Sequence, residues 1–185
     1  DAELRFLQRC GVRHKAASFP FHPDRGWDLD ELCRERDRHA DWGIALDMSL
    51  IPIYEQLPNI IYYGRSPERD REIDLVCDMI RTASQAGIDS LRYNTCILPI
   101  DRTEAEEGRG GYRHTAFRLD KVPPQARQTL TDAGRVTAEM HWERIEHLLE
   151  RIVPVATEHR VRLGNSQEDP PTPPGFRGVD KVLND

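Results

Sequence analysis

The segment from Gly108 to Gly111, within the run EEGRGGYRHTAF, carries residue types suited to holding an anion. Its glycines permit positive φ angles and a close approach of the backbone to a ligand, and Arg109 can hold a carboxylate through two parallel hydrogen bonds. The segment is not a P-loop, because no Lys-Ser or Lys-Thr follows it. Nor does it open a helix, as a dinucleotide fingerprint does. These residues alone favour a plain flexible loop over an anion clamp.

A second group of polar residues lies within an apolar run. Arg92, Tyr93 and Asn94 belong to the stretch IDSLRYNTCIL, and Arg102 follows shortly after it. An amide such as that of Asn94 must be hydrogen-bonded when it is buried, because an unpaired polar group in apolar surroundings is unfavourable. Its partner is either another part of the protein or a substrate, and both alternatives stay open.

The sequence offers few metal ligands. Glu168 and Asp169 are hard oxygen donors suited to Mg²⁺ or Mn²⁺, although acidic residues before prolines are more often exposed turn residues. None of the seven histidines belongs to an HExxH motif, and His141 and His147 are spaced to lie on different faces of a helix. Most histidines are expected to be solvated or packed. His14 is the exception, because its strand is expected to end at the ligand-binding edge of the sheet.

The overall charge excludes some classes of partner. With 26 Lys and Arg against 32 Asp and Glu, the net charge is −6, which gives no general attraction to nucleic acids or anionic lipids. No window approaches the ~20 apolar residues that cross a bilayer, and the opening DAELRFLQRC is too charged for a signal peptide. The four cysteines include no CxxC pair and are expected to be reduced and buried in a cytoplasmic protein. The first residue is not Met, as expected of a fragment of a longer protein.

Hydrophobic periodicity predicts an alternation of helices and strands. Helices are expected at residues 2–10, 27–43, 67–86 and from 138 onward, and strands at 12–19, 44–53, 88–98 and 161–165. Ser66 and Thr137 are suitable N-caps, and Pro154 is expected to kink or end the last helix. The side chains expected to face the core are Leu4, Phe6, Leu7, Cys10, Leu29, Leu32, Cys33, Ile44, Leu46, Met48, Leu50, Ile73, Val76, Cys77, Ile80, Trp142, Ile145, Leu148, Leu149 and Ile152.

Two polar stretches directly follow predicted strands. Residues 99–135 form a connection far longer than the ~12–15 residues beyond which an irregular loop is functional or disordered, and a second stretch, GNSQEDPP, begins at Gly164. In parallel α/β folds, ligands bind at the carboxyl edge of the sheet. We count about four strand-helix units, against the eight of a closed (β/α)8 barrel. The predicted class is therefore α/β, as either a small open sheet or part of a barrel.

Several of these segments together resemble one family. The runs RSPERDREIDLVCDMIRTASQAGI, LRYN, RTEAEEGRGGYRHTAFRLDK, LTDAGRVTAEMHWERIEHLLERIVPVATEHRVRL and EDPPTPPGFRGVDKVL resemble bacterial mannonate dehydratases, in the xylose-isomerase-like group of TIM barrels. The resemblance implies a partial (β/α)8 barrel of roughly strands two to five with their helices. Residues 1–185 would form a single incomplete domain, and residues 99–135 its long active-site loop. The implied reaction is dehydration of D-mannonate to 2-keto-3-deoxy-D-gluconate in glucuronate breakdown, with Mn²⁺ or Fe²⁺.

The resemblance also implies a site. Asn94, Arg102, Arg109 and Gly110 are expected to contact the sugar acid, while Ser166 occupies the position of the family's ligand histidine. A serine hydroxyl is a poorer ligand than imidazole, so metal affinity is expected to fall unless the acidic pair that follows compensates. The family's other ligands, a Cys, a further His and an Asp, come from later strands. No catalytic acid or base is assigned.

Three functions are compatible with these features. The first is a mannonate dehydratase-like lyase, whose isolated chain is expected to be inactive and to self-associate through open sheet edges. The second is a sugar isomerase or epimerase of the same superfamily, whose product would be a ketose or an epimer. The third, suggested by Ser166, is a non-catalytic relative that binds a sugar acid or pairs with a second chain.

Overall fold

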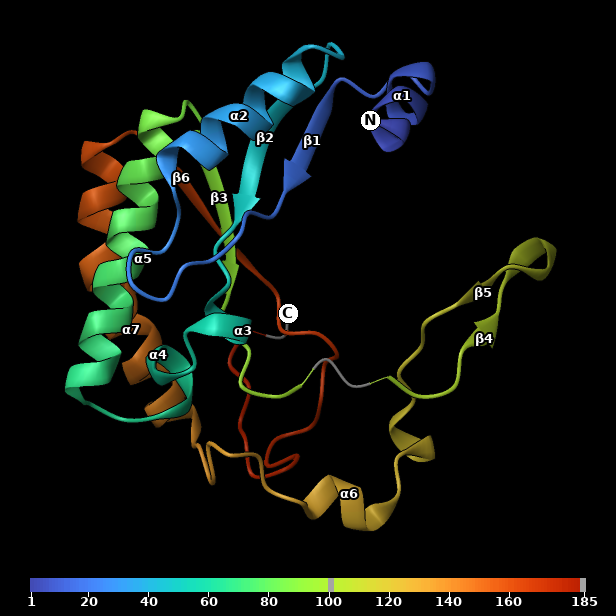
Figure 1. The fold of residues 1–185 in the computed structure, drawn as a ribbon. Coiled ribbons are helices and arrows are strands. Elements are labelled where there is room, and N and C mark those ends of the chain that lie inside the picture. Colours follow the sequence, from blue (N-terminus) through green and yellow to red (C-terminus); the bar gives the residue numbers. More distant parts are fainter. Residues whose placement is uncertain (100–101, 184–185) are drawn as a thin grey trace.

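The protein is built on a parallel sheet with helices packed on one face. The computed structural model describes residues 1–99 and 102–183. Its main sheet has four strands in the order β1-β2-β3-β6, and all neighbouring strands are parallel (Figure 1). The strands are β1 (His14–Ala17), β2 (Ala45–Leu50), β3 (Ser90–Asn94) and β6 (Arg162–Ser166). The predicted α/β class is confirmed.

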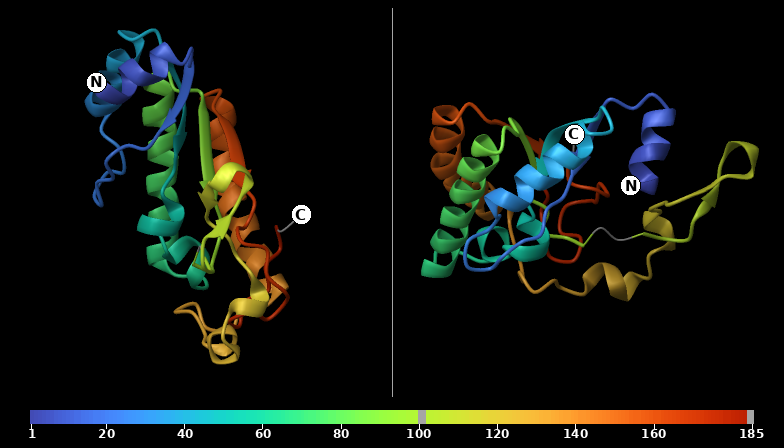
Figure 2. Two further views of the ribbon diagram at one scale, coloured as in Figure 1. Left: turned by 90° about the vertical axis from the view of Figure 1, so that its right-hand side faces the viewer. Right: turned by 45° about the horizontal axis from the view of Figure 1, so that its top comes forward.

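Three long helices form the covering layer, and each connects two neighbouring strands (Figures 1 and 2). They are α2 (Leu29–Ala40), α5 (Pro67–Gln85) and α7 (Ala138–Glu158). The smaller elements are α1 (Ala2–Arg9), α3 (Ile53–Gln56), α4 (Asn59–Tyr62), β4 (Glu106–Glu107), η1 (Arg109–Gly111), β5 (Arg113–His114), η2 (Leu119–Lys121) and α6 (Pro124–Gln128). None of the helices in the described part of the chain combines the length and apolar character that crossing a bilayer requires.

Local signals fix where the two longest helices begin. Ser66 Oγ and Thr137 Oγ1 each accept a hydrogen bond from the main-chain N–H three residues on, at 3.1 and 3.3 Å, as predicted for N-caps. Of the two effects expected of Pro154, a kink or an end of the last helix, the end is wrong, because α7 continues to Glu158. The proline removes one main-chain donor. Ala156, in the turn beyond it, is buried and keeps that turn packed against the protein.

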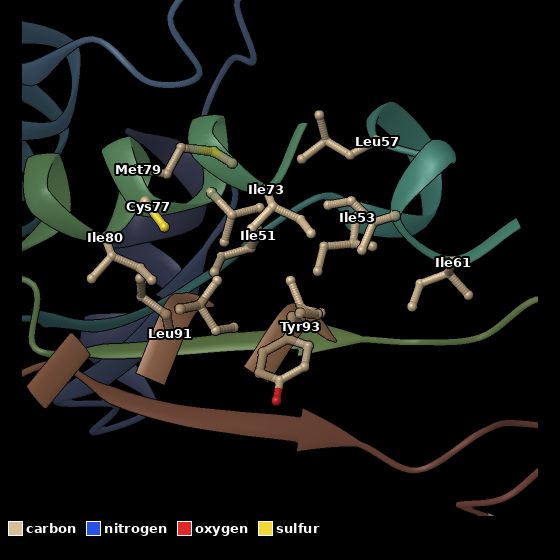
Figure 3. Close-up of a cluster of buried hydrophobic side chains, with 14 of the residues drawn as sticks. Ile51, Ile53, Leu57, Ile61, Ile73, Cys77, Met79, Ile80, Leu91 and Tyr93 are labelled. Carbon is tan, nitrogen blue, oxygen red and sulfur yellow. The ribbon is translucent and has the colours of Figure 1, made fainter. Parts of the chain in front are cut away.

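The core lies between the sheet and this helix layer. Leu91 and Tyr93 of β3 belong to the same buried cluster as Ile73, Cys77 and Ile80 of α5 (Figure 3). All the side chains predicted to point inward from α5 are buried. Each large apolar side chain buried in this way contributes about 1.5–3 kcal/mol to stability.

Of the side chains predicted to face the core, Cys10 and four larger apolar ones are exposed. Phe6 is 66% exposed, Trp142 42%, Met48 38% and Leu29 36%. The three that belong to helices, Phe6, Leu29 and Trp142, lie outside the buried face of their helix, which is narrower than predicted. Helix α1, for example, buries Leu4 alone.

The prediction of four buried cysteines holds for Cys77 and Cys96 and is wrong for Cys10, which is exposed. Cys33 is only partly buried, and all four thiols are free. Burial raises the pKa of the Cys96 thiol to about 11 and also raises that of Cys77. The buried thiols are therefore poor nucleophiles near neutral pH.

The exposure of Met48 follows from an irregularity in β2. Leu46 and Met48 pair with consecutive residues of β1, so Asp47 is skipped in the register. A skipped residue reverses which face the following side chains take. Leu46 before the irregularity and Ser49 after it are therefore both buried, whereas Asp47 and Met48 are exposed.

Buried polar side chains hold α4 at both ends. The Glu72 carboxylate, from α5, accepts hydrogen bonds from Asn59 Nδ2 at 2.5 Å and from Ile60 N at 3.2 Å. Arg144, from α7, donates to the main-chain oxygens of the last two residues of α4 at 2.7 and 2.9 Å. A single helical turn leaves most of its N–H and C=O groups without internal partners. These contacts supply partners and fix the connection that follows the carboxyl end of β2.

Replacing Arg144 tests this brace. We expect Arg144→Met to lower the free energy of unfolding by about 1–3 kcal/mol, because two carbonyl oxygens lose their donor in a buried place. The control is Arg151→Met on the same helix. Arg151 pairs with Asp74 at 2.5 Å on the surface, so its loss is expected to change stability by less than about 0.5 kcal/mol. Equal effects of the two substitutions in urea denaturation would contradict the brace.

The sheet has unpaired edges in the described chain. Each of the outer strands, β1 and β6, has a neighbour on one side. Exposed strand edges favour pairing with another chain. We therefore expect the 185-residue protein to self-associate, with a mass in size-exclusion chromatography and light scattering that rises with concentration. A monomeric mass at every concentration tested would contradict this.

Candidate functional site

The carboxyl ends of β3 and β6 bring three polar side chains to the face of the sheet that points away from the helices, which we call the open face. Asn94 lies opposite Ser166, and Arg92 lies opposite Gly164 in the parallel register. The residues on either side of Arg92 are buried in the core (Figure 3), so the alternation of the strand turns Arg92 and Asn94 to the open face. We call Arg92, Asn94 and Ser166 the strand-end site.

No residue described in the structure provides a hydrogen-bond partner for the side chains of this site. The Oδ1 atom of Asn94 is buried and accepts no hydrogen bond. Neither Arg92 nor Ser166 makes a side-chain hydrogen bond or ion pair within residues 1–99 and 102–183. A buried acceptor without a donor is unfavourable unless something else supplies one. A ligand hydroxyl group can donate to Asn94 in this position.

The loops that follow β3 and β6 are joined by an ion pair. Arg102 Nη2 donates to Asp169 Oδ2 at 2.5 Å. Two of the predicted site residues are thus brought together, although one is a predicted metal ligand and the other a predicted sugar-acid contact. In the sequence this ion pair is close to the strand-end site, because Asp169 comes three residues after Ser166.

A larger cavity lies on the side of the long loop. Its volume is about 850 Å³, and Arg102, Lys121 and Arg177 line it together with apolar side chains. Phe117 and Phe176 meet edge to face there, with ring centroids 6.3 Å apart. Arg177 also donates from Nε to a main-chain oxygen of the same wall at 3.1 Å.

Arg109 and Gly110 do not reach the strand-end site in this structure. They form η1 at the tip of the β4–β5 hairpin, which projects away from the sheet (Figure 1). Gly110 has a φ of 72°, so it uses the backbone freedom that was predicted for it. The predicted loop at residues 99–135, of which 100 and 101 lie outside the described residues, contains this hairpin, η2 and α6.

Glu168 is a buried carboxyl group rather than the exposed turn residue that was favoured. Its Oε1 lies 3.4 Å from Nε2 of His141, and both side chains have no exposed surface. Burial raises the pKa of Glu168 to about 7 and lowers the pKa of His141. The two imidazole nitrogens lie 3.1 Å from the main-chain oxygens of Thr95 and Asp180. His141 therefore ties α7 to the segments that follow β3 and β6.

The candidate metal ligands do not form one set. Glu168 points inward to His141, whereas the side chain of Asp169 is 60% exposed and turns to Arg102. No group of three or more His, Cys, Asp or Glu residues suited to a metal ion occurs among the residues that the structure describes. Divalent cations need several converging donors. The residues present thus do not fit such an ion as a set.

His14 does not lie where it was expected. It is the first residue of β1, so it sits at the amino end of the strand, opposite the edge where Asn94 and Ser166 lie. There its Nδ1 atom pairs with Asp47 at 2.5 Å. Arg92, in contrast, was not assigned a role from the sequence, although its spacing of two residues from Asn94 already indicates a shared face.

The fold defines the class of protein: the four parallel strands and their connecting helices form part of a (β/α)8 TIM barrel. A structure of D-psicose 3-epimerase in the presence of D-fructose matches with a TM-score of 0.52 at 12% identity, over 88% of this chain and 44% of that chain. No protein-family model matches the sequence. The prediction of a partial barrel is confirmed.

Within this class, the chain is similar to mannonate dehydratases in sequence and in fold. It is 24% identical to mannonate dehydratase from Shouchella clausii (strain KSM-K16) over 177 residues, which cover 78% of this chain and 48% of that protein. The crystal structure of mannonate dehydratase from Streptococcus suis serotype2 matches with a TM-score of 0.74 at 21% identity, over 96% of this chain and 53% of that chain. The chain thus spans about half the length of these relatives. The resemblance seen in the sequence is confirmed, and the structural matches establish the fold alone.

Replacing Ser166 tests whether a stronger ligand at the end of β6 restores metal binding. When the chain is joined to the later strands of a mannonate dehydratase, from which the resemblance implies the remaining ligands, we expect Ser166→His to raise the affinity for Mn²⁺ at least about tenfold, because imidazole is a far better ligand than a hydroxyl group. Electron paramagnetic resonance of free Mn²⁺ measures this. Gln128→His, which adds a histidine to the exposed helix α6, is expected to leave the affinity unchanged. Equal affinities of wild type and Ser166→His would show that residue 166 does not limit metal binding.

Proposed function

We propose that this chain contributes the sugar-acid-binding part of a mannonate dehydratase-like hydro-lyase, which converts D-mannonate to 2-keto-3-deoxy-D-gluconate in glucuronate breakdown. The observation that carries the proposal is the strand-end site. Its three unpartnered polar side chains lie at the carboxyl edge of a parallel sheet, where enzymes of this fold class bind substrates. The similarity to mannonate dehydratases supports the choice of substrate class.

The residues of this chain would bind and orient the substrate rather than carry out proton transfer. Asn94 and Ser166 lie side by side and are suited to the hydroxyl groups of a sugar acid. The Arg102–Asp169 pair would hold the two loops beside the site in a fixed relation. Dehydration also requires removal of the proton next to the carboxylate and a general acid for the departing hydroxyl. We assign neither role to a described residue.

The cofactor stays a proposal that rests on the family resemblance. Mn²⁺ or Fe²⁺ would supply positive charge for the enediolate that forms when the proton leaves. The described residues do not fit such an ion as a set, so none of the roles proposed for them depends on a bound metal. The four free thiols suit a reducing compartment, which supports a cytoplasmic location.

A sugar isomerase or epimerase is the second candidate, and the fold similarity to D-psicose 3-epimerase favours it. The third is a non-catalytic sugar-acid binder, which the serine at position 166 favours. The product distinguishes the three. A dehydratase yields a 2-keto-3-deoxy acid with a new methylene group, an isomerase or epimerase yields an isomer of the substrate, and a binder yields no product.

The experiment uses the 185-residue chain alone and as a chimera in which it replaces the matching part of the Streptococcus suis protein. Each is incubated with D-mannonate and Mn²⁺, and products are followed by ¹H NMR. We expect no turnover by the isolated chain and formation of the 2-keto-3-deoxy acid by the chimera carrying Ser166→His. Turnover by the isolated chain at ordinary enzyme rates would contradict the assignment of a binding part. Formation of an isomer of the substrate would contradict the dehydratase proposal and support the sugar isomerase or epimerase.

A further inference from the structure

Arg92 occupies a distinctive position on the open face. It lies in the middle of the sheet, between Leu50 of β2 and Gly164 of β6 in the register. A methyl group added at Gly164 would meet no atom within 4 Å, so the space on that side of Arg92 is free. Arg92 therefore has a side-chain neighbour, Leu50, on one side and unfilled space for a ligand on the other.

The other arginines near this edge of the sheet already have acidic or main-chain partners. Arg102 pairs with Asp169, and Arg144 donates to the end of α4. Asp47, the acidic residue on the neighbouring strand β2, pairs with His14. Arg92 makes no side-chain hydrogen bond or ion pair within residues 1–99 and 102–183. Its five N–H donors, arranged as a fork, are therefore available to an anion.

A small hollow adjoins Arg92. Its volume is about 130 Å³, and it is lined by Arg92 and by small or apolar residues of β1 and β2 and the turn after β1, among them Ala16, Ser18, Met48 and Leu50. A space of this size suits the carboxylate end of a ligand rather than a whole cofactor. Among the described residues no acidic side chain lines it, so none of its lining residues would repel an anion.

Asn94 extends this arrangement toward the carboxyl edge. Two residues along a strand place side chains of one face roughly 6.6 Å apart. The buried, unpaired Oδ1 of Asn94 needs a donor, and the guanidinium group needs an acceptor. A ligand with a carboxylate at one end and hydroxyl groups along its carbon chain supplies both the acceptor and the donor.

We propose that Arg92 binds the carboxylate of a hydroxy acid and that Asn94 accepts a hydrogen bond from one of its hydroxyl groups. This inference rests on the proposed function for the identity of the acid, and it moves the role of carboxylate contact from Arg102 and Arg109 to Arg92. A two-pronged contact between a guanidinium and a carboxylate group gives both affinity and orientation. Arg92 is thus the residue that distinguishes an acid from the neutral polyol of the same length.

The experiment titrates the full 185-residue chain with D-mannonate and, separately, with the uncharged D-mannitol, by calorimetry or NMR. We expect wild type to prefer mannonate, and Arg92→Gln to weaken mannonate binding at least about tenfold with mannitol binding unchanged. Arg92→Lys keeps the charge and loses the fork, so an intermediate affinity is expected. The matched control is Arg162→Gln. Arg162 lies on β6 at the opposite end of the sheet, where it pairs with Asp89 at 2.9 Å, and its replacement is expected to change neither affinity.

Two results would overturn the proposal: equal mannonate affinities for wild type and Arg92→Gln, or no preference of wild type for the acid over the polyol. Circular dichroism of each variant confirms that the fold is intact, and a misfolded Arg92→Gln is replaced in the comparison by Arg92→Lys and Arg92→Met. The outcome is separable from that of the dehydratase proposal. If mannonate binding depends on Arg92 but the chimera forms no product, the role of Arg92 stands and the dehydratase proposal fails. If the chimera dehydrates mannonate and Arg92→Gln leaves its KM unchanged, the dehydratase proposal stands and the role of Arg92 fails.

Discussion

The packing of helices against one face of the sheet is the constraint on which the rest of this structure depends. Leu91 and Tyr93 are buried against the helix layer, so the residues between and beyond them must take the other face. A shift of one residue in β3 would bury Arg92 and expose two core side chains. The same hydrophobic burial that stabilises the sheet therefore decides which polar groups are presented at its carboxyl edge.

Buried polar side chains on the helices also fix the positions of the connections that follow the strands. Glu72 and Arg144 hold the turn of helix after β2, and His141 contacts the main chain after β3 and near the end of the described chain. Apart from the side chains of Asn59 and Glu168, their partners are main-chain groups, which must be satisfied once they are buried. The connections at the carboxyl edge of the sheet are thus held by the helix layer as well as by the strands. Their positions depend on side chains far away in the sequence.

Much of the fold could be predicted because the signals are local. The N-cap at Ser66 and the buried stripe of α5 need only a few neighbouring residues. The skip at Asp47 could not be predicted, since it arises only when two strands pair. The burial of Glu168 likewise depends on α7 and on the last segment. The sequence singled out Asn94 by its type within an apolar run and Ser166 by the family resemblance, but only the register of β3 with β6 places the two side by side.

The position of the cationic groups bears on how this protein can recognise an acid. Arg102 lies beside the large cavity on the loop, but its charge is opposed by Asp169. Arg109 lies at the tip of a hairpin that projects away from the sheet (Figure 2). A contact that selects an acid must be held at a fixed distance from the groups that bind its hydroxyls. A strand provides this better than a loop, because neighbouring strands on both sides fix its main chain. In the proposed arrangement, recognition built on β3 and β6 would therefore depend on the geometry of the sheet rather than on the position of the long loop.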